Sequence, residues 1–201
     1  KYIWGAGYGI PYNSLVRFQE GESPGIFWGY KADGIFQNQT EVDNHATQPN
    51  AQPGDIRFVD VNGDGVVNAD DRTKIGDPFA DFSLGWNLNF KVYDFDLSIS
   101  TYGTFGNDIF RGYERNLNYT NKPVSVLSRW TGEGTSNFEP RATFVDSNNN
   151  VRPSTRYVED GSYFKIKNVQ LGYNFNLADS KALDGVRIYL QGKNLMTFTD
   201  Y

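Results

Sequence analysis

The sequence predicts an all-β fold in which antiparallel strands form part of a transmembrane β-barrel with long loops. Aromatic residues are frequent, at 16%, whereas hydrophobic residues reach only 38% in total. Several segments alternate between apolar and polar residues, a pattern that gives a strand one apolar and one polar face. Short and long connections also alternate along the chain, as in barrels with short turns at one end and long loops at the other.

The clearest strands lie in the middle of the chain. In segment 82–92, Leu84, Trp86 and Leu88 share one face, and Asn87 and Asn89 share the other. Segment 95–103 repeats this alternation. The short sequence VYD between the two segments predicts a tight hairpin.

Two further alternating segments, 169–177 and 186–195, lie near the end of the chain, and a short turn is expected after Leu177. Weaker strands are expected at 14–20 and 25–36. The best helix candidate is segment 122–130, where Val126, Leu127 and Trp130 are at helical spacing and Pro123 stands near the start.

The polar face of the strands favours a membrane barrel. It consists of Asn, Gln, Ser and Gly, which suit a wet interior, and the strands have the roughly nine to eleven residues that a tilted membrane strand needs. The polar segments 37–78 and 103–162 are then the long extracellular loops. A soluble β-sandwich produces similar alternation and stays open as an alternative. In the barrel, the side chains expected to face lipid include Trp86, Phe90, Phe95, Tyr173 and Phe175.

Composition and motifs argue against several other classes. A net charge of −5 gives no basic surface for nucleic acid, and the absence of Cys excludes disulfides and thiol chemistry. His45 lies in a polar loop without a positioned partner, so a catalytic role is not expected. The other candidate side chains are carboxylates whose spacing singles out no catalytic pair: Glu139, Asp146, Glu159 and Asp160. We therefore expect that the chain is not an enzyme.

The segment 58–76, FVDVNGDGVVNADDRTKIG, has the spacing of a calcium-binding loop. Counted from Asp60, oxygen ligands fall at positions 1, 3, 5, 7, 9 and 12, and Gly65 occupies position 6, where the backbone turns sharply. The predicted ligand set is Asp60, Asn62, Asp64, the Val66 carbonyl, Asn68 through a water, and Asp71. The expected role of the calcium ion is structural.

Position 12 departs from the usual loop, because Asp71 stands where a longer Glu would bind the ion through both oxygens. This resembles the loop of dockerin-type modules and leaves the affinity open. The competing interpretation is an Asp- and Asn-rich turn that binds nothing, since these residues favour turns for reasons of their own.

A series of motifs resembles the C-terminal barrel region of SusC/RagA-type TonB-dependent outer-membrane transporters. The longest is GDIRFVDVNGDGVVNADDRTKIGDPFADFSLGWNLNFKVYDFDLSIS, at 54–100. Others are GIFWGYKADGIFQNQTEV, YGTFGNDIF, RYVEDGSYFKIKNVQLGYNF and RIYLQGKNLMTFTDY. Together they cover roughly residues 21–201.

The resemblance implies a large outer-membrane barrel of about twenty-two strands, located in a Gram-negative cell of the Bacteroidota type. Its implied function is TonB-dependent import of nutrients, either glycans or peptides. Implied partners are a SusD-like surface lipoprotein that caps the barrel, TonB acting through an N-terminal region, and outer-membrane lipid.

We expect the 201 residues to form an incomplete, C-terminal part of the barrel, without the plug domain and the last strand, and to supply about six to eight strands. In that setting calcium would hold the 58–76 loop in shape. The alternative function is a secreted, calcium-stabilised all-β binding module.

Overall fold

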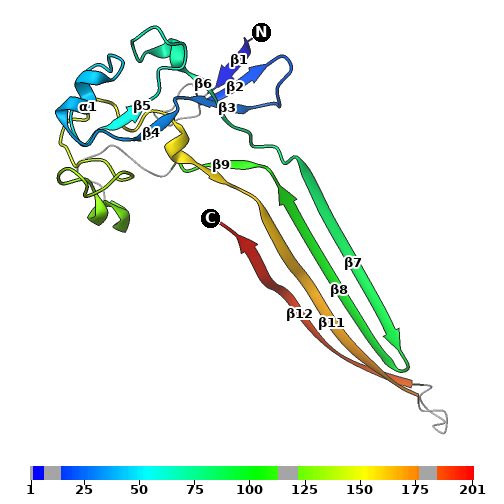
Figure 1. The fold of residues 1–201 in the computed structure, drawn as a ribbon. Coiled ribbons are helices and arrows are strands. Elements are labelled where there is room, and N and C mark those ends of the chain that lie inside the picture. Colours follow the sequence, from blue (N-terminus) through cyan, green and yellow to red (C-terminus); the bar gives the residue numbers. More distant parts are fainter. Residues whose placement is uncertain (1, 7–14, 113–121, 177–184) are drawn as a thin grey trace. The chain divides into compact units, whose positions relative to one another are not determined.

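The computed structural model of the chain describes residues 2–6, 15–112, 122–176 and 185–201 (Figure 1). The chain divides into two compact units. Residues 1–78 and 109–159 form the first, called here the loop unit, and residues 79–108 and 160–201 form the second, called the sheet unit.

Among the described elements, the strands β7, β8, β11 and β12 are long and the other strands are short. The strands are β1 (Tyr2–Ala6), β2 (Val16–Gln19), β3 (Ile26–Gly29), β4 (Ala32–Ile35), β5 (Ile56–Phe58), β6 (Thr73–Gly76), β7 (Phe82–Val92), β8 (Phe95–Phe105), β9 (Asp108–Phe110), β10 (Val158–Asp160), β11 (Tyr163–Asn176) and β12 (Gly185–Thr199). The helices are α1 (Gln39–Asn44) and three 3-10 turns, η1 (Ala69–Asp71), η2 (Val124–Ser128) and η3 (Thr155–Tyr157).

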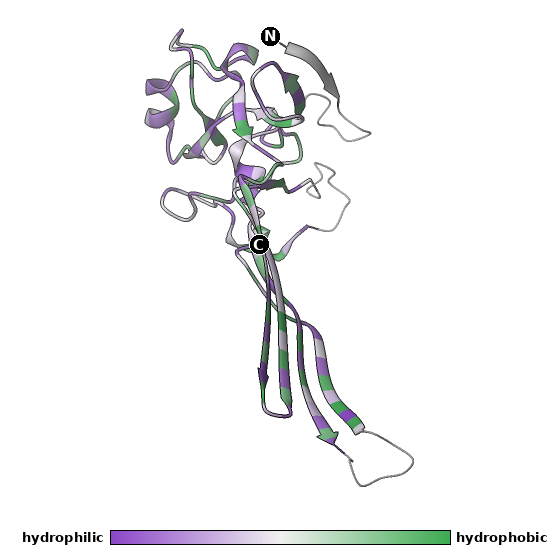
Figure 2. Cartoon of the chain, turned by 90° about the vertical axis from the view of Figure 1, so that its right-hand side faces the viewer, coloured by the Kyte–Doolittle hydropathy of each residue, from purple (hydrophilic) through white to green (hydrophobic). Residues whose placement is uncertain are grey.

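The sheet unit is built on a single four-stranded antiparallel sheet in the order β12-β11-β8-β7 (Figure 1). Its strands contain 11 to 15 residues, against the roughly nine to eleven that cross a bilayer at a tilt. Hydrophilic and hydrophobic residues alternate along them (Figure 2). The sheet is open in this chain, because β7 and β12 each pair with one neighbour.

On the polar face of this sheet, side chains of adjacent strands form hydrogen bonds with one another. Three such bonds, of 2.6–2.7 Å, join Ser98 to Asn89, Ser100 to Asn87, and Gln191 to Asn168. Partners bonded across neighbouring strands must lie on the same face. The predicted placement of Asn87 and Asn89 on the polar face is therefore confirmed.

An ion pair also crosses the polar face, from β8 to β12 over the intervening β11. The guanidinium of Arg187 donates to both carboxylate oxygens of Asp96, at 2.5 and 3.1 Å. The β11 residue between them is Gly172, where a Cβ would lie 2.5 Å from an Asp96 oxygen and 2.8 Å from Arg187 Nη2. The glycine thus leaves the space that the pair occupies.

The apolar face of the sheet is largely exposed among the described residues. Trp86 and Phe90 are each 53% exposed, and Ile188 is 60% exposed. Some aromatic rings on this face contact one another, as in the pair Phe95 and Tyr173 with ring centroids 4.6 Å apart. Exposed aromatic surface of this extent on the described strands indicates contact with an apolar partner or an apolar solvent.

The turn between β7 and β8 has two residues, Tyr93 and Asp94, which confirms the predicted tight hairpin. Tyr93 has a φ of +53°, a conformation that Gly and Asn adopt more easily. The turn is also bonded to β11, because the Asn174 amide donates to the Asp94 carbonyl at 2.9 Å. The turn expected after Leu177 lies outside the described residues.

The loop unit contains one sheet in the order β1-β2-β3-β6 and a two-stranded sheet of β4 and β5. Its buried hydrophobic residues are Ile26, Ile35, Phe36, Ile56, Phe58, Val67, Ile75 and Tyr157. The chain segment after β9 returns to these strands: Tyr30 forms a parallel bridge with Ser154 and hydrogen bonds with Pro153 and Thr155. This contact is close, since a Cβ on Gly29 would lie 2.3 Å from the Pro153 carbonyl oxygen.

The fold confirms the predicted all-β class and corrects three details. Within the described ranges only four strands reach barrel length, fewer than the six to eight expected. The early apolar segment 25–36 breaks into β3 and β4, and it contains two glycines with positive φ, Gly25 just before β3 and Gly34 within β4. The expected helix at 122–130 is a short 3-10 turn, in which Leu127 is exposed. None of the helices described is long and apolar enough to cross a membrane.

Candidate functional site: an aspartate-rich loop and a buried amide network

The aspartate-rich loop connects β5 to β6 and is anchored at its middle. Val67 is buried and packs against Ile56 and Phe58. Thr47 flanks this point, donating its amide to the Gly65 carbonyl at 2.7 Å and accepting from the Val67 amide at 3.0 Å. The buried Val67 therefore fixes the loop to the core while the residues on its N-terminal side stay exposed.

Two carboxylates organise the loop backbone. Asp60 accepts the amide of Gly63 at 2.7 Å with one oxygen and the amide of Gly65 at 2.8 Å with the other. Gly65 has a φ of +86°, which glycine adopts without strain. Asp71, wholly buried, accepts the Asn68 amide at 2.7 Å and the Val61 amide at 2.8 Å. The loop thus curls around its own aspartates.

The Asp71 carboxylate is stabilised in its charged form. Burial alone would raise its pKa, but hydrogen bonds from the amides of Asn68, Val61 and Asn62 lower the pKa below the ordinary value of 3.8. Asp71 is consequently ionised at neutral pH, as a cation ligand or a backbone cap requires.

The remaining predicted ligands bond to the nearby backbone. Asn62 Oδ1 accepts the Asp64 amide at 2.9 Å, and Asp64 Oδ1 accepts the Val66 amide at 2.9 Å. The Asn68 side chain accepts the Asp70 amide at 2.7 Å and donates to the Val66 carbonyl at 3.3 Å. All six predicted residues therefore belong to one continuous hydrogen-bonded loop.

The candidate ligand atoms of this loop suit calcium, because all of them are hard oxygen atoms. A carboxylate oxygen that accepts one amide keeps a second lone pair for a cation. Across the part of the chain that the structure describes, no three Asp, Glu, His or Cys side chains lie together as a metal site. The calcium ligand set stays a prediction.

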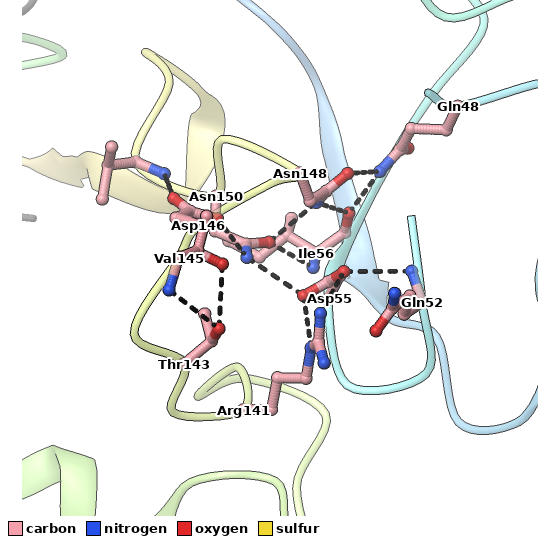
Figure 3. A network of polar contacts seen from close by, with 11 residues as sticks. Gln48, Gln52, Asp55, Ile56, Arg141, Thr143, Val145, Asp146, Asn148 and Asn150 are labelled. Atoms are coloured by element: carbon pink, nitrogen blue, oxygen red, sulfur yellow. Dashed lines mark hydrogen bonds and ion pairs between the residues drawn. The ribbon is translucent and has the colours of Figure 1, made fainter. Parts of the chain in front are cut away.

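A second feature, which the sequence did not reveal, is a network of buried side-chain amides (Figure 3). Its inner members are the amides of Gln48, Asn148 and Asn150 and the carboxylate of Asp55, each less than a tenth exposed. Gln48 and Asn148 bond directly at 2.7 Å although they are 100 residues apart. The nearest signal in the sequence was the Asn run at 148–150, which on its own indicates only a turn.

The network occupies the edge of β5 where another strand would pair. Gln48 accepts the Phe58 amide at 2.9 Å and donates to the Ile56 carbonyl at 2.8 Å. Asn150 accepts the Ile56 amide at 2.7 Å, and Asn148 donates to the same carbonyl at 3.1 Å. Side chains therefore satisfy the polar groups of an edge that would otherwise be open for pairing.

An ion pair completes the network. Arg141 donates through Nε and Nη2 to the two oxygens of Asp55, at 2.8 and 3.2 Å, and Asp55 is fully buried (Figure 3). Gln52 and Asn150 donate to the same carboxylate at 3.0 and 3.2 Å. These contacts hold segment 139–157 against β5.

The side chains considered for catalysis have structural roles. His45 Nδ1 lies 2.9 Å from the Ala46 carbonyl oxygen. Glu139 pairs with Arg156 at 2.8 Å, and Glu159 pairs with Arg111 at 3.3 Å. Asp146 accepts from Asn150, and Asp160 accepts the Ser162 amide.

Aromatic side chains of the predicted long loop 103–162 are candidates for ligand contact, among them Tyr113, Tyr119, Trp130 and Phe138. Trp130 covers Gly54 and donates to the Gln37 side chain at 3.3 Å, so its ring packs within the loop unit. Phe138 is exposed and has the guanidinium of Arg156 over its ring. Tyr113 and Tyr119 lie outside the described residues.

The named relatives of this chain are all TonB-dependent receptors, although no protein-family model matches the chain. It is 33% identical to TonB-dependent receptor P3 of Formosa agariphila over 91% of this chain and 18% of that protein. It is 26% identical to TonB-dependent receptor SusC of Bacteroides thetaiotaomicron over 86% of this chain and 17% of that protein. The chain therefore spans about a fifth of the length of the curated relatives it matches.

The fold is similar to part of a solved transporter. A structure of the RagAB peptide importer in its closed-closed state superposes with a TM-score of 0.68, covering 96% of this chain and 21% of the importer chain at 21% identity. A structure of the same importer in its open-open state gives a TM-score of 0.65. At this identity the superposition establishes the fold.

Proposed function

We propose that this chain, a segment of the SusC/RagA type of TonB-dependent receptors, forms part of the wall and outer loops of an outer-membrane nutrient importer. The observation that carries the proposal is the four-stranded sheet, with one bare apolar face and one hydrogen-bonded polar face on strands long enough to cross a bilayer. Proteins of this type reside in the outer membrane of Bacteroidota. Import requires no covalent chemistry from the chain.

In the proposed importer the two faces of the sheet meet different surroundings. The face with Trp86 and Phe90 contacts lipid, and the face with Asn87 and Asn89 lines the barrel interior. The loop unit belongs to the extracellular side, where it holds its shape through its own core. A SusD-like lipoprotein caps this side, and TonB provides energy through a region beyond these residues.

The imported nutrient is a glycan or a peptide. Of the proteins similar to this chain, RagAB is called a peptide importer, whereas the name of SusC, a TonB-dependent receptor, states no substrate. The exposed Phe138, with Arg156 behind its ring, suits contact with either ligand, because aromatic rings stack on sugars and on apolar side chains alike.

Uptake by cells that carry the full-length receptor tests the proposal. Deleting its gene should abolish uptake of one labelled class, oligosaccharides or peptides, and restoring the gene should recover it. Collapsing the proton gradient should stop uptake by the restored strain. Uptake unaffected by the deletion, together with recovery of the protein from the medium as a soluble monomer, would support the secreted binding module instead.

For the aspartate-rich loop we propose a structural calcium ion held by Asp60, Asn62, Asp64, the Val66 carbonyl and Asp71, with Asn68 bonded through water. The support is the ligand spacing, the ionised Asp71 and the curled backbone around Asp60. Sites in extracellular modules bind calcium with Kd of about 10⁻⁴–10⁻³ M, so a weak site fills outside the cell.

Calcium titration of the intact receptor distinguishes a site from a plain turn. Asp60→Asn should weaken calcium binding at least about tenfold, because it removes a charged ligand. Asp70→Asn is the matched control, since it removes an equal charge from an exposed neighbour outside the ligand set. Equal affinities for the two variants would contradict the proposed ligands.

A further inference from the structure

The four long strands of the sheet unit carry a charge opposite in sign to that of the whole chain. The chain has a formal net charge of −5, yet β7, β8, β11 and β12 contain a single acidic residue, Asp96. Their basic residues are Lys91, Lys165, Lys167, Arg187 and Lys193. Uncharged polar side chains alone would suit a wet interior, so the excess of basic residues indicates a further role.

The register of the strands places basic side chains on the polar face. Lys165 pairs with Tyr102, which lies two residues beyond Ser100 on β8, and Ser100 belongs to the polar face. Lys193 pairs with Asn168, which also belongs to the polar face. Residues that pair directly across neighbouring strands share a face, so both lysines lie on the polar side of the sheet.

A β-bulge adds a third lysine to this face. The pairing of β11 with β8 shifts by one residue between Ile166 and Asn168, so Lys167 has no partner on β8. A bulge of this kind redirects the side chain of the extra residue. The Lys167 ammonium lies 5.7 Å from the centroid of the Tyr102 ring, which places it on the polar face, and the side chain is exposed.

Two tyrosine rings position the ammonium groups at the end of the sheet away from the β7–β8 turn. The Lys165 ammonium lies 5.2 Å from the centroid of the Tyr163 ring, and the rings of Tyr163 and Tyr102 are 6.3 Å apart. A ring attracts a cation through its face and leaves the three N–H donors of the lysine available for an anion. The lysine–tyrosine patch consists of Tyr102, Tyr163, Lys165, Lys167 and Lys193.

The positive charge of this patch is not balanced by a nearby carboxylate. None of the ion pairs found among the described residues includes Lys165, Lys167 or Lys193. Asp96, the one acidic residue of the four strands, pairs with Arg187 near the opposite end of the sheet. A wall that carries charge of one sign concentrates ligands of the opposite charge, so the patch favours an anion.

On the basis of the proposed importer function, we propose that the lysine–tyrosine patch binds an anionic oligosaccharide, one that carries carboxylate or sulfate groups. The lysines pair with the anionic groups, the tyrosine rings pack against the sugar rings, and the nearby amides of Asn168 and Gln191 bond to hydroxyl groups. A peptide fits this face less well. The inner strands β8 and β11 are paired on both sides, so a peptide cannot add to them as a further strand.

Binding to the full-length receptor in detergent tests this site without requiring transport. The probes, matched in length, are an oligogalacturonate, a sulfated galactan oligosaccharide and a neutral galactan oligosaccharide. One of the two anionic probes should bind about tenfold more tightly than the neutral one, as expected for two or three exposed charge pairs. The preference should shrink as salt is added, because salt screens such pairs. The probe that binds more tightly identifies the anionic group.

Two results of this titration would overturn the proposal. One is equal affinity for the anionic and neutral oligosaccharides, which would show that the lysines do not contact the ligand. The other is tighter binding of an acidic peptide of equal charge than of either anionic oligosaccharide, which would assign the patch to peptides.

Lysine variants locate the binding within the sheet. Lys167→Gln should weaken binding of the preferred anionic probe about threefold, and the double change Lys165→Gln with Lys167→Gln should remove most of the preference. Affinity for the neutral probe should stay the same. The matched control is Lys91→Gln, which removes the same charge from the polar face near the β7–β8 turn and should leave all affinities unchanged.

The variants also separate this inference from the importer function itself. An equal loss in Lys91→Gln and Lys167→Gln would overturn the patch, because the attraction would then come from the charge of the whole face. If deleting the gene abolishes nutrient uptake while the double variant binds and imports the anionic probes like the unmodified receptor, the importer function stands and the patch is refuted.

Discussion

The two units of the chain bury their side chains in opposite ways. Every buried hydrophobic residue identified among the described positions lies in the loop unit, as does every buried polar one. The sheet unit instead exposes residues such as Trp86, Phe90 and Ile188 by half or more. Its strands are the longer ones and its hydrogen bonding is the more regular, yet none of its described hydrophobic side chains is buried.

This difference shows where the stability of each unit originates. The loop unit is held by a small apolar core and by buried polar groups such as Asp55 and Asn148, which are satisfied internally and suit a surface in water. In the sheet unit the inner strands β8 and β11 are hydrogen-bonded on both sides, and the sheet needs an apolar solvent on one face only. Changes inside the loop unit should therefore act locally, whereas changes on the sheet should act through the membrane.

The largest effect is expected from breaking the buried ion pair of the loop unit. Asp55→Ala leaves Arg141, Asn150 and the Gln52 amide without their acceptor, and loss of one partner of a buried pair costs about 3–5 kcal/mol. Hydrogen exchange of the Ile56 and Phe58 amides should accelerate accordingly.

The control for this change is Asp43→Ala, which removes an exposed carboxylate on α1 and should leave exchange at β5 unchanged. Strong acceleration in the control, or none in Asp55→Ala, would mean that the amide network does not hold segment 139–157 in place.

A comparable effect is expected on the sheet, but on one face only. Leu88→Arg puts a charge on the apolar face and should destabilise the folded barrel by about 2–4 kcal/mol if the residue lies near the bilayer midplane. Asn87→Arg puts the same charge on the polar face and should cost little. Urea titration of the receptor folded into lipid vesicles measures both, and similar costs would refute the assignment of faces.

A smaller effect is expected at Asp71, and it depends on pH. The carboxylate has a pKa below 3.8 in the folded loop, so its stabilising contribution is present above the unfolded pKa and is lost as pH falls through the folded pKa. Asp71→Asn should lower the free energy of unfolding by about 1.5–3 kcal/mol at neutral pH, because the amides of Val61 and Asn68 lose a charged acceptor.

Hydrogen exchange of the Val61 and Asn68 amides, corrected for the intrinsic effect of pH, reports this contribution. Protection in the unmodified receptor should hold at neutral pH and fall below about pH 4. In Asp71→Asn it should be low at every pH, and a persistent acid transition in this variant would assign the transition to another group.

The smallest effect is a gain in stability at the β7–β8 turn. Tyr93→Asn should stabilise the hairpin by about 0.5–1 kcal/mol, because Asn adopts positive φ at lower cost. Tyr93→Phe keeps the ring and the strained conformation and should be neutral. If both variants behave alike in urea titration, the backbone angle at Tyr93 carries no measurable strain.

The sequence predicted the sheet unit better than the loop unit, for a physical reason. Alternation with a period of two is a local property, so it located β7 and β8 within two residues, whereas for β11 and β12 it missed the first six and the last four residues. The network of Gln48 with Asn148 joins residues 100 apart, and no local pattern encodes such a contact. The aspartate-rich loop falls between these cases, because its spacing predicts ligands but not whether an ion occupies them.

Accessibility along β7 tests most directly the central claim that this sheet is a barrel wall between lipid and a wet interior. The chain contains no Cys, so single cysteines can carry spin labels at each of positions 84–90 in a receptor whose other cysteines are removed. Collision with oxygen, which concentrates in lipid, should peak at even positions such as Trp86 and Leu88. Collision with a water-soluble nickel complex should peak at Asn87 and Asn89. Uniform accessibility to the nickel complex, or the opposite alternation, would contradict the account.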